Sequence, residues 1–406
     1  MTDQYKKIFV YHGNHNIIEG IQDHFEILSE IFIIHNFKII YSQYIVPNEI
    51  NIVIEEFKDL KTINHINNMK NIYKNTKLVV ICTEFITSVR GVKTLNGFYH
   101  GFVFSNLVLM LSKYVQYRNR NTKKNKYSVL RIIKFCIFYI LKPIKIFFKV
   151  VNYILKKIRD FLLFAIPHKK DLLIKYRKYF FIPNPFKLYK HFVDNILKKS
   201  KWYNNLYYAV YMKLRFDGLS EIINKANYIL TFHPKINSQI RESFNLNSSC
   251  IYPIINNYEN KFNYILTKDT LNAVCTGNHT PYRLEKITEI QTKLKSSNKK
   301  IGLTIENFLN DEDFRKFDIL LTIPQDPNWE NSSPVRVWRA IKNSVLPTSY
   351  VYYNDHEIEK LSILVKDNLE DIKENNKLKK YNFNINEYNK YANNMNQSFI
   401  NIFNNM

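Results

Sequence analysis

Cysteine and glycine are scarce in this chain. The four cysteines lie far apart and form no C-x-x-C pair, which argues against a zinc site or a disulfide framework. A reducing, cytosolic setting fits this usage best. Glycine accounts for only 8 of the 406 residues, while Asn, Ile, Lys and Tyr are abundant throughout. We interpret this as a bias of the whole composition rather than a local signal.

We expect neither a secretory signal nor a membrane-spanning helix in this sequence. Its first residues run straight into the apolar stretch "KIFVY" at 7–11, without the charged-then-apolar pattern of a secretory signal. In the apolar residues 131–166, no stretch of 18 residues is free of charge, so we do not expect a spanning helix. A chain of 406 residues is too long for one ordinary core, and we expect two or three folded units.

Positive charge is in excess, and it is concentrated in one segment. Residues 118–201 hold 23 Lys or Arg side chains and three Asp side chains, so they carry +20 of the formal net charge of +24. The rest of the chain is therefore close to neutral. We interpret residues 118–201 as a basic module inserted into a nearly neutral protein.

Residues 131–166 of this module have the pattern of an amphipathic helix. At the helical period, the basic side chains fall on one face, and Ile, Phe, Leu, Val and Tyr form a wide apolar face. This arrangement is typical of a helix in the membrane interface, with lysines toward anionic lipid, and Pro143 is expected to kink it. The residues predicted to contact lipid are Lys134, Lys142, Lys145, Lys149 and Lys156.

Two other interpretations of the basic module are possible. A merely solvated charged face would not carry so large an apolar half. Nucleic-acid binding also combines basic and aromatic residues, and "YRNRNTKKNKY" at 117–127 could follow phosphates. A continuous Ile, Phe and Leu face suits lipid better than separate stacking platforms. We therefore expect an anionic membrane surface as the partner, and no nucleic acid.

Elsewhere, short apolar runs alternate with helical patterns, which favours parallel α/β sheets. The expected strands are residues 7–11, 37–42, 51–57, 77–85, 226–231, 250–255, 271–276, 299–305, 317–324 and 348–353. Helices are expected across 21–36, 234–246, 281–294 and after Ser333. The result is an α/β protein of two Rossmann-like domains with a basic amphipathic insertion in the first, and with a ligand at the carboxyl ends of the strands.

These patterns also predict the domain boundaries. Residues 1–117 would begin the N-terminal Rossmann-like acceptor domain, 118–201 would be the membrane-associating insertion, and 202–260 would complete the first domain. Residues 261–365 would form the C-terminal Rossmann-like domain, and 366–406 an Asn-rich helix or tail.

One predicted helix starts with an unexpected charge. In "NSSPVRVWRAIKNSVLP", Ser333 suits the N-cap and Pro334 the first helical position. Arg336 then falls at the third position, where the helix dipole disfavours a cation by roughly 0.3 to 1 kcal/mol. An incoming phosphate group would explain Arg336, since free N–H groups at a helix start bind anions. The alternatives are that Arg336 extends into solvent or pairs with Glu330.

Residues 270–355 resemble the nucleotide-binding domain of bacterial glycosyltransferases of the GT-B fold, in the manner of families 1 and 4. "CTGNHTPYR" at 275–283 is similar to their first strand and glycine turn. "NSSPVRVWRAIKNSVLPTSYVYY" at 331–353 resembles their helix facing the donor diphosphate, often written S-P-x-R-x-x-E-A-x-x-x-G-x-P. The acidic residue of that pattern is absent here, and Ser344 stands in place of the glycine.

The resemblance implies a nucleotide-sugar donor and chemistry without a metal or other cofactor. Residues expected to bind the donor are Gly277, Arg283, Glu306, Ser332, Ser333 and Arg336, with Arg336 also holding the leaving diphosphate. A general base is needed to deprotonate an acceptor hydroxyl. The candidates are His12, His15 and Glu84, which follow predicted strands of the first domain.

We therefore expect a peripheral enzyme on the cytoplasmic face of the cell membrane that glycosylates a lipid-linked or cell-envelope glycan acceptor. The alternative is a non-catalytic membrane- or nucleic-acid-binding protein on a degenerate Rossmann pair. "FDG" at 216–218 and "FHP" at 232–234 are similar to motifs of some bacterial sialyltransferases and give a weaker indication of the donor. "DED" at 311–313 is expected to begin a helix rather than bind a metal.

Overall fold

The computed structural model describes residues 6–12, 22–55, 60–89, 92–95, 105–121, 150–151, 153–154, 157–158, 201–256, 268–277, 280–296, 300–306, 309–324, 333–351, 355–364 and 384–406. The chain forms two compact units. The larger unit comprises Met1–Ile86 and Gly218–Met406, and the smaller unit comprises Thr87–Asp217.

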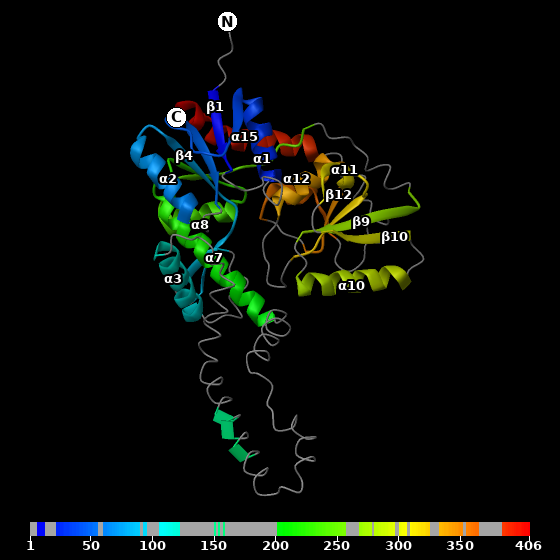
Figure 1. Ribbon diagram of the computed structural model, residues 1–406. Coiled ribbons are helices and arrows are strands. Elements are labelled where there is room, and N and C mark those ends of the chain that lie inside the picture. The colour runs from blue at the N-terminus through cyan, green and yellow to red at the C-terminus, as the bar shows by residue number, and fades with distance from the viewer. Residues whose placement is uncertain are drawn as a thin grey trace. The chain divides into compact units, whose positions relative to one another are not determined.

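The larger unit contains a first sheet of six parallel strands in the order β2-β1-β3-β4-β7-β8 (Figure 1). Its strands are β1 (Lys6–Tyr11), β2 (Phe37–Ser42), β3 (Ile50–Ile54), β4 (Lys77–Cys82), β7 (Tyr228–Thr231) and β8 (Ser248–Cys250). Helices α1 (Gln22–Ile34), α2 (Leu60–Ile72) and α8 (Pro234–Phe244) lie between them in the chain. All five residues of β3 are buried, as expected for a strand covered on both faces.

A second sheet of five parallel strands has the order β10-β9-β11-β12-β13. Its strands are β9 (Thr270–Thr276), β10 (Lys300–Glu306), β11 (Ile319–Thr322), β12 (Leu346–Ser349) and β13 (Ile363–Leu364). The associated helices are α10 (Pro281–Ser296), α11 (Asp311–Phe314), α12 (Pro334–Lys342) and the 3₁₀ helix η5 (Glu357–Leu361). We call residues 6–86 and 218–256 the first half, and residues 268–364 the second half.

Both sheets follow the same winding rule. Numbered along the chain within each sheet, the strand order begins 2-1-3-4-5, the order of flavodoxin-like doubly wound sheets. The winding therefore reverses between β1 and β3 in the first half, and between β9 and β11 in the second. Ligands of such sheets bind outside the carboxyl ends of the strands at this switch point.

The two halves share one hydrophobic core, in which the indole of Trp338 from α12 is fully buried. Its Nε1 donates a hydrogen bond to the carbonyl oxygen of Ile254 at 2.8 Å. Because Ile254 lies just beyond the first sheet, this bond joins the second half to the end of the first. A buried indole N–H needs such a partner.

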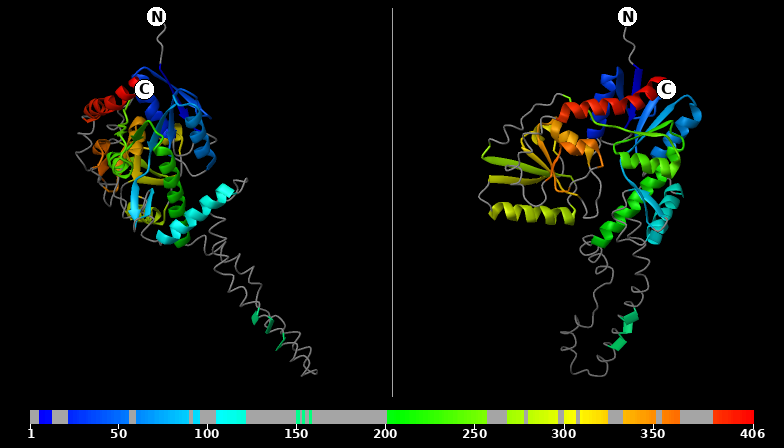
Figure 2. Two further views of the ribbon diagram at one scale, coloured as in Figure 1. Left: turned by 90° about the vertical axis from the view of Figure 1, so that its left-hand side faces the viewer. Right: turned by 180° about the vertical axis from the view of Figure 1, so that it is seen from behind.

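Helix α15 (Asn384–Asn405) packs back onto the first half, beside α1 (Figure 2). The side-chain amides of Asn396 and Asn389 hydrogen-bond to backbone N–H and carbonyl groups, as a neighbouring strand would. Asn396 accepts from the N–H of Tyr252 and donates to its carbonyl at 2.9 and 2.8 Å. Asn389 does the same for Ile255 at 2.9 and 2.8 Å. The Asn-rich C-terminus thus pairs a buried extended segment.

The smaller unit contains the paired strands β5 (Ile86–Val89) and β6 (Val92–Leu95), helix α3 (Ser105–Asn121), and most of helix α7 (Lys201–Ile223). Asp217 of the "FDG" sequence lies within α7. Its carboxylate is bound by Lys213 of the same helix, and it accepts a hydrogen bond from Gln116 of α3 at 2.7 Å. This acidic residue is therefore engaged by its own unit.

The mixed α/β class with parallel sheets is confirmed, while the GT-B domain arrangement and the predicted boundaries remain expectations. Most of the predicted insertion, residues 118–201, lies outside the described residues. Residues 250–255 are in strand only at their start, because β8 ends at Cys250. The strand predicted at 348–353 begins two residues earlier, at Leu346, and ends at Ser349. "DED" at 311–313 begins α11, as predicted.

Candidate functional site at the switch point of the second sheet

Gly277 directly follows β9 and brings two arginines close together. Its φ of +95° lies in the left-handed region, which favours glycine. A Cβ atom at this position would lie 2.7 Å from Nη2 of Arg336 and 3.4 Å from Nη1 of Arg283. The absence of a side chain therefore makes room for two guanidinium groups beside the carboxyl end of β9. The structure thus groups three of the predicted donor-binding residues.

Arg283 is held rigidly at the bottom of this group. It is the third residue of α10, and only 1% of it is exposed. Its Nε and Nη2 donate to the carbonyl oxygen of Ile323 at 3.0 and 2.7 Å. Its Nη1 lies 3.5 Å from the carbonyl oxygen of Thr276. Thr276 ends β9 and Ile323 follows β11, so the guanidinium bridges the two strands of the switch point.

Arg336 completes the group from the third position of α12 and is partly exposed. Burial lowers its pKa, and the Cys275 thiol and the Asp23 carboxylate act in the opposite direction. Within the described part of the chain, no acceptor forms a hydrogen bond or ion pair with this guanidinium. Glu330, the alternative partner expected from the sequence, lies outside the described residues. An anion at this guanidinium would be held by charge-assisted hydrogen bonds.

Cys275 does not neutralise this positive charge. The thiol is buried near the end of β9, and burial raises its pKa, although Arg283 and Arg336 lower it. A thiol with a raised pKa stays protonated at neutral pH. The two guanidinium groups thus keep a net positive potential at the switch point.

The start of α12 matches the predicted position but is capped differently. Ser333 is the N-cap residue and Pro334 the first helical residue, yet the Ser333 side chain makes no capping hydrogen bond. The Ser333 N–H instead donates to Oε1 of Glu359 at 3.2 Å. Burial and the nearby Asp355 raise the pKa of Glu359 to about 8, against the effect of the Ser333 N–H. Glu359 is therefore largely protonated at neutral pH and adds little negative charge.

A buried histidine group lies next to this cap. His233, the residue after Phe232 in "FHP", is the N-cap of α8, and its Nδ1 accepts from the N–H of Lys235 at 3.1 Å. Its Nε2 is 3.0 Å from Oδ2 of Asp355, without hydrogen-bond alignment. The His356 ring lies 6.1 Å away; burial and His233 lower the pKa of His356 to about 3, against the effect of Asp355. His356 is thus neutral.

The other predicted residues lie at strand ends but outside the group. His12 follows β1, where its N–H donates to the Ser42 carbonyl at 3.0 Å; its buried Nδ1 has no hydrogen-bond partner in the part of the chain that the structure describes. Glu84 follows β4 and is partly buried. Glu306 ends β10, and its carbonyl accepts from the Gly277 N–H at 3.2 Å, so its backbone adjoins the group. His15 and Ser332 lie outside the described residues.

Three polar residues that the sequence analysis did not single out are Glu55, at the switch point of the first sheet, and Glu359 and Asp23, which contact the region of α12. Glu55 follows β3 at the switch point of the first sheet, is fully buried, and accepts from the Thr83 hydroxyl at 3.2 Å. A carboxylate directly after the apolar run "INIVI" could have signalled it. Glu359 and Asp23 carry no such signal, because each meets its partners only after folding.

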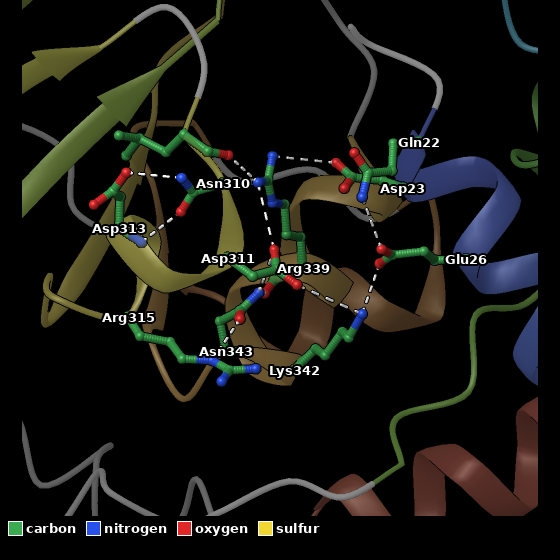
Figure 3. Close-up of polar contacts among 11 residues, drawn as sticks. Gln22, Asp23, Glu26, Asn310, Asp311, Asp313, Arg315, Arg339, Lys342 and Asn343 are labelled. Atoms are coloured by element: carbon green, nitrogen blue, oxygen red, sulfur yellow. Dashed lines mark hydrogen bonds and ion pairs between the residues drawn. The ribbon is translucent and has the colours of Figure 1, made fainter. Parts of the chain in front are cut away.

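Helices α1 and α12 are joined by an ionic cluster (Figure 3). Arg339 lies between Asp23 of α1 and Asp311 of α11, with nitrogen–oxygen distances of 3.5 Å to each. Lys342 lies 2.6 Å from Oε2 of Glu26 and 3.7 Å from Oδ2 of Asp311. Arg339 also donates to the Leu309 carbonyl. The cluster thus links the first half to the second half. On α12, Arg339 and Lys342 lie one and two helical turns beyond Arg336.

The predicted lipid-contacting lysines, Lys134, Lys142, Lys145, Lys149 and Lys156, all lie outside the described residues. Four described apolar residues of the same module, Val150, Tyr153, Ile154 and Ile158, are 46–62% exposed at helical spacing. Across the residues that the structure describes, no helix is long and apolar enough to span a membrane. In the same residues, no three His, Cys, Asp or Glu side chains are grouped so as to hold a metal ion.

Comparisons with protein-family models, with curated proteins and with solved structures found no match for this chain.

Proposed function

We propose that this protein is a glycosyltransferase that moves a sugar from a nucleotide-sugar donor to a lipid-linked or cell-envelope glycan acceptor at the cytoplasmic membrane face. The observation that carries the proposal is the pair of guanidinium groups beside Gly277, at the switch point of a parallel sheet. Arg336 has no acidic partner among the described residues. In dinucleotide-binding sheets of this kind, the pyrophosphate of the ligand sits at a helix N-terminus near the switch point.

The two arginines have different roles in this proposal. Arg283, fixed on the Ile323 carbonyl, shapes the site and supplies a constant positive field. Arg336 and the N–H groups at the start of α12 bind the donor phosphates, together with Ser332 and Ser333. As the bond between sugar and phosphate breaks, negative charge grows on the departing diphosphate, and these fixed donors stabilise it.

The membrane part of the proposal rests on the basic module. Its charge of +20 would attract anionic lipid, and the exposed side chains of Val150, Tyr153, Ile154 and Ile158 would enter the interface. Such an attachment would confine the enzyme and a lipid-borne acceptor to one surface. The same exposed apolar residues favour lipid over nucleic acid as the partner.

Thermal unfolding with UDP, GDP, dTDP, ADP and CMP, in mild detergent, tests the donor site. A nucleotide at 100 times its dissociation constant should stabilise the wild type by about 2.7 kcal/mol. Arg336→Ala should lose most of this shift, because its guanidinium binds the phosphates. The matched control is Arg315→Ala, which removes an exposed arginine bonded to Asn343 and should keep the shift. If no nucleotide stabilises the wild type, the proposal is wrong.

A further inference from the structure

Asp23 stands out in the ionic cluster of α1 and α12. It is the second residue of α1, and its side chain is 25% exposed. Its Oδ2 lies 3.5 Å from Nη1 of Arg339, which is one helical turn after Arg336. Figure 3 shows the Asp23 carboxylate turned toward α12. A carboxylate of the first half thus faces the helix that carries Arg336.

Asp23 is also the described carboxylate whose charge acts on Arg336. In the proposed function, Arg336 holds the phosphate group that leaves the sugar. The acceptor is expected on the side of the first half, to which Asp23 belongs. Asp23 therefore lies where an acceptor hydroxyl of the first half would meet a donor phosphate of the second half.

We propose that Asp23 is the general base of the transfer reaction, an inference that rests on the proposed function. The acceptor hydroxyl oxygen forms a bond with the anomeric carbon, and the bond from that carbon to the phosphate oxygen breaks. The electron pair leaves with the nucleotide, whose charge Arg336 offsets. The hydroxyl proton goes to the Asp23 carboxylate. No oxidant, reductant or metal is needed.

The surroundings of Asp23 suit this role. Burial raises its pKa to about 6; Arg339 and Lys342 of α12 lower it, while Glu26 of α1 and Asp311 of α11 raise it. A carboxylate with a pKa near 6 is mostly ionised at neutral pH, yet it is a stronger base than a free aspartate. His12 and Glu84 lie just after β1 and β4, whereas Asp23 contacts α12 through Arg339.

Glu26 provides a matched control. It lies one turn after Asp23 on α1 and forms the closer ion pair, 2.6 Å from Lys342. Arg339 keeps the Leu309 carbonyl and Asp311 as partners when Asp23 is changed. If the cluster only joins the two halves, Asp23→Asn and Glu26→Gln should have similar effects. If Asp23 is the base, only Asp23→Asn should change turnover.

The experiment compares wild type, Asp23→Asn and Glu26→Gln. The probe is the commercial UDP-, GDP-, dTDP-, ADP- or CMP-sugar whose nucleotide stabilises the wild type, with water as acceptor, and released nucleotide is measured between about pH 5 and 8. The wild-type rate should rise through about pH 6 and level off, as the base ionises. Asp23→Asn should lower the rate about 100-fold or more and remove this rise, while nucleotide binding persists. Glu26→Gln should keep the plateau rate and move the rise only to slightly lower pH, because Glu26 is one of the groups that raise the pKa of Asp23.

Each contrary result has a distinct meaning. A wild-type rate and pH profile in Asp23→Asn would overturn the role of Asp23 and leave the proposed function standing. A lower rate in Asp23→Asn that still rises through about pH 6 would also overturn it, because another group would then be the titrating base. Absence of nucleotide binding by the wild type would remove the proposed function, and the base with it.

Discussion

The two halves of the larger unit share a strand order but differ in the charge at their switch points. In the first half, β1 and β3 are followed by His12 and the buried Glu55. In the second, β9 is followed by Gly277, beside which Arg283 and Arg336 meet. Topology places a site at each switch point, and the side chains decide which ligand suits it. Among the described residues, only the second switch point is shown to bring two guanidinium groups together.

The same contrast holds for two helix starts. Helices α8 and α12 both begin with proline, yet His233 caps α8 with its own Nδ1, whereas Ser333 makes no such bond. Glu359, from η5, binds the Ser333 N–H instead. Helix α8 of the first half is thus capped by the side chain of its own N-cap residue. The start of α12 is instead bound by Glu359, a group that can be displaced or can titrate.

The largest effect is expected from removing that titrating cap. The folded-state pKa of Glu359, about 8, lies above the unfolded value of 4.5. The wild type therefore has the full contribution of protonated Glu359 below about pH 4.5 and loses it as pH rises through 8. Glu359→Gln keeps an acceptor for the Ser333 N–H but cannot ionise. Urea unfolding should show it more stable than wild type by on the order of 3 kcal/mol above pH 8, and equal near pH 4.

Glu357→Gln is the control for this measurement. Glu357 lies on the same 3₁₀ helix but pairs with Lys360 at the surface, 2.7 Å apart. Its loss should change the free energy of unfolding by about 0.5 kcal/mol or less at either pH. Parallel pH curves for Glu359→Gln and wild type would show that Glu359 is ionised in the folded protein.

A smaller effect is expected when the residue that follows the first strand of each sheet, Gly277 or His12, is changed to alanine. Gly277→Ala places a Cβ 2.7 Å from Nη2 of Arg336 at a φ that L-residues avoid. We expect a loss of about 1–2 kcal/mol in unfolding free energy and weaker nucleotide binding, because Arg336 must move. His12→Ala, at the matching position after β1, should cost less than about 0.5 kcal/mol.

Chemical denaturation and nucleotide titration of the two alanine variants measure this difference. Gly302→Ala is a further control, since a Cβ there would meet only Oδ1 of Asn272 at 3.4 Å. Equal losses in Gly277→Ala and His12→Ala would mean that the close approach of the arginines does not require glycine.

Much of the fold could be predicted from local patterns. The short apolar run "FKIIYS" predicts the strand at 37–42 with its true limits, although only Phe37 of that strand is buried. Residues 250–255 look like such a run too, but Tyr252 and Ile255 bond to Asn396 and Asn389 of α15 instead of a strand. No local pattern reveals that an amide more than a hundred residues away replaces a strand.

The residues of the candidate site also fall into two groups, those that a local sequence pattern indicates and those that only the folded chain brings together. Gly277, Arg283 and Arg336 were found because each lies in a local motif, a strand end or a helix start, and the switch point brings those motifs together. Asp23 and Glu359 were missed because their role depends on which helix packs against them. For these residues, burial and the neighbouring charges set the chemistry, and both arise only in the folded chain.

The smallest effect concerns two helix ends in the left-handed conformation. Ser344 follows α12 with φ +59°, and its N–H and that of Val345 bond to the carbonyls of Ile341 and Ala340, as in a Schellman motif. Ser344→Gly should raise the unfolding free energy by about 0.5–1 kcal/mol, because serine is strained at this φ.

Asn245 ends α8 in the first half with φ +53°. Asparagine tolerates this conformation better than serine, so Asn245→Gly should gain about half as much or less. Paired thermal and urea unfolding of the two glycine variants can resolve this difference. An equal gain at both ends would mean that the strain comes from the left-handed backbone itself, whatever its side chain. A gain confined to Ser344 would mean that the second half carries a local cost that the first half avoids.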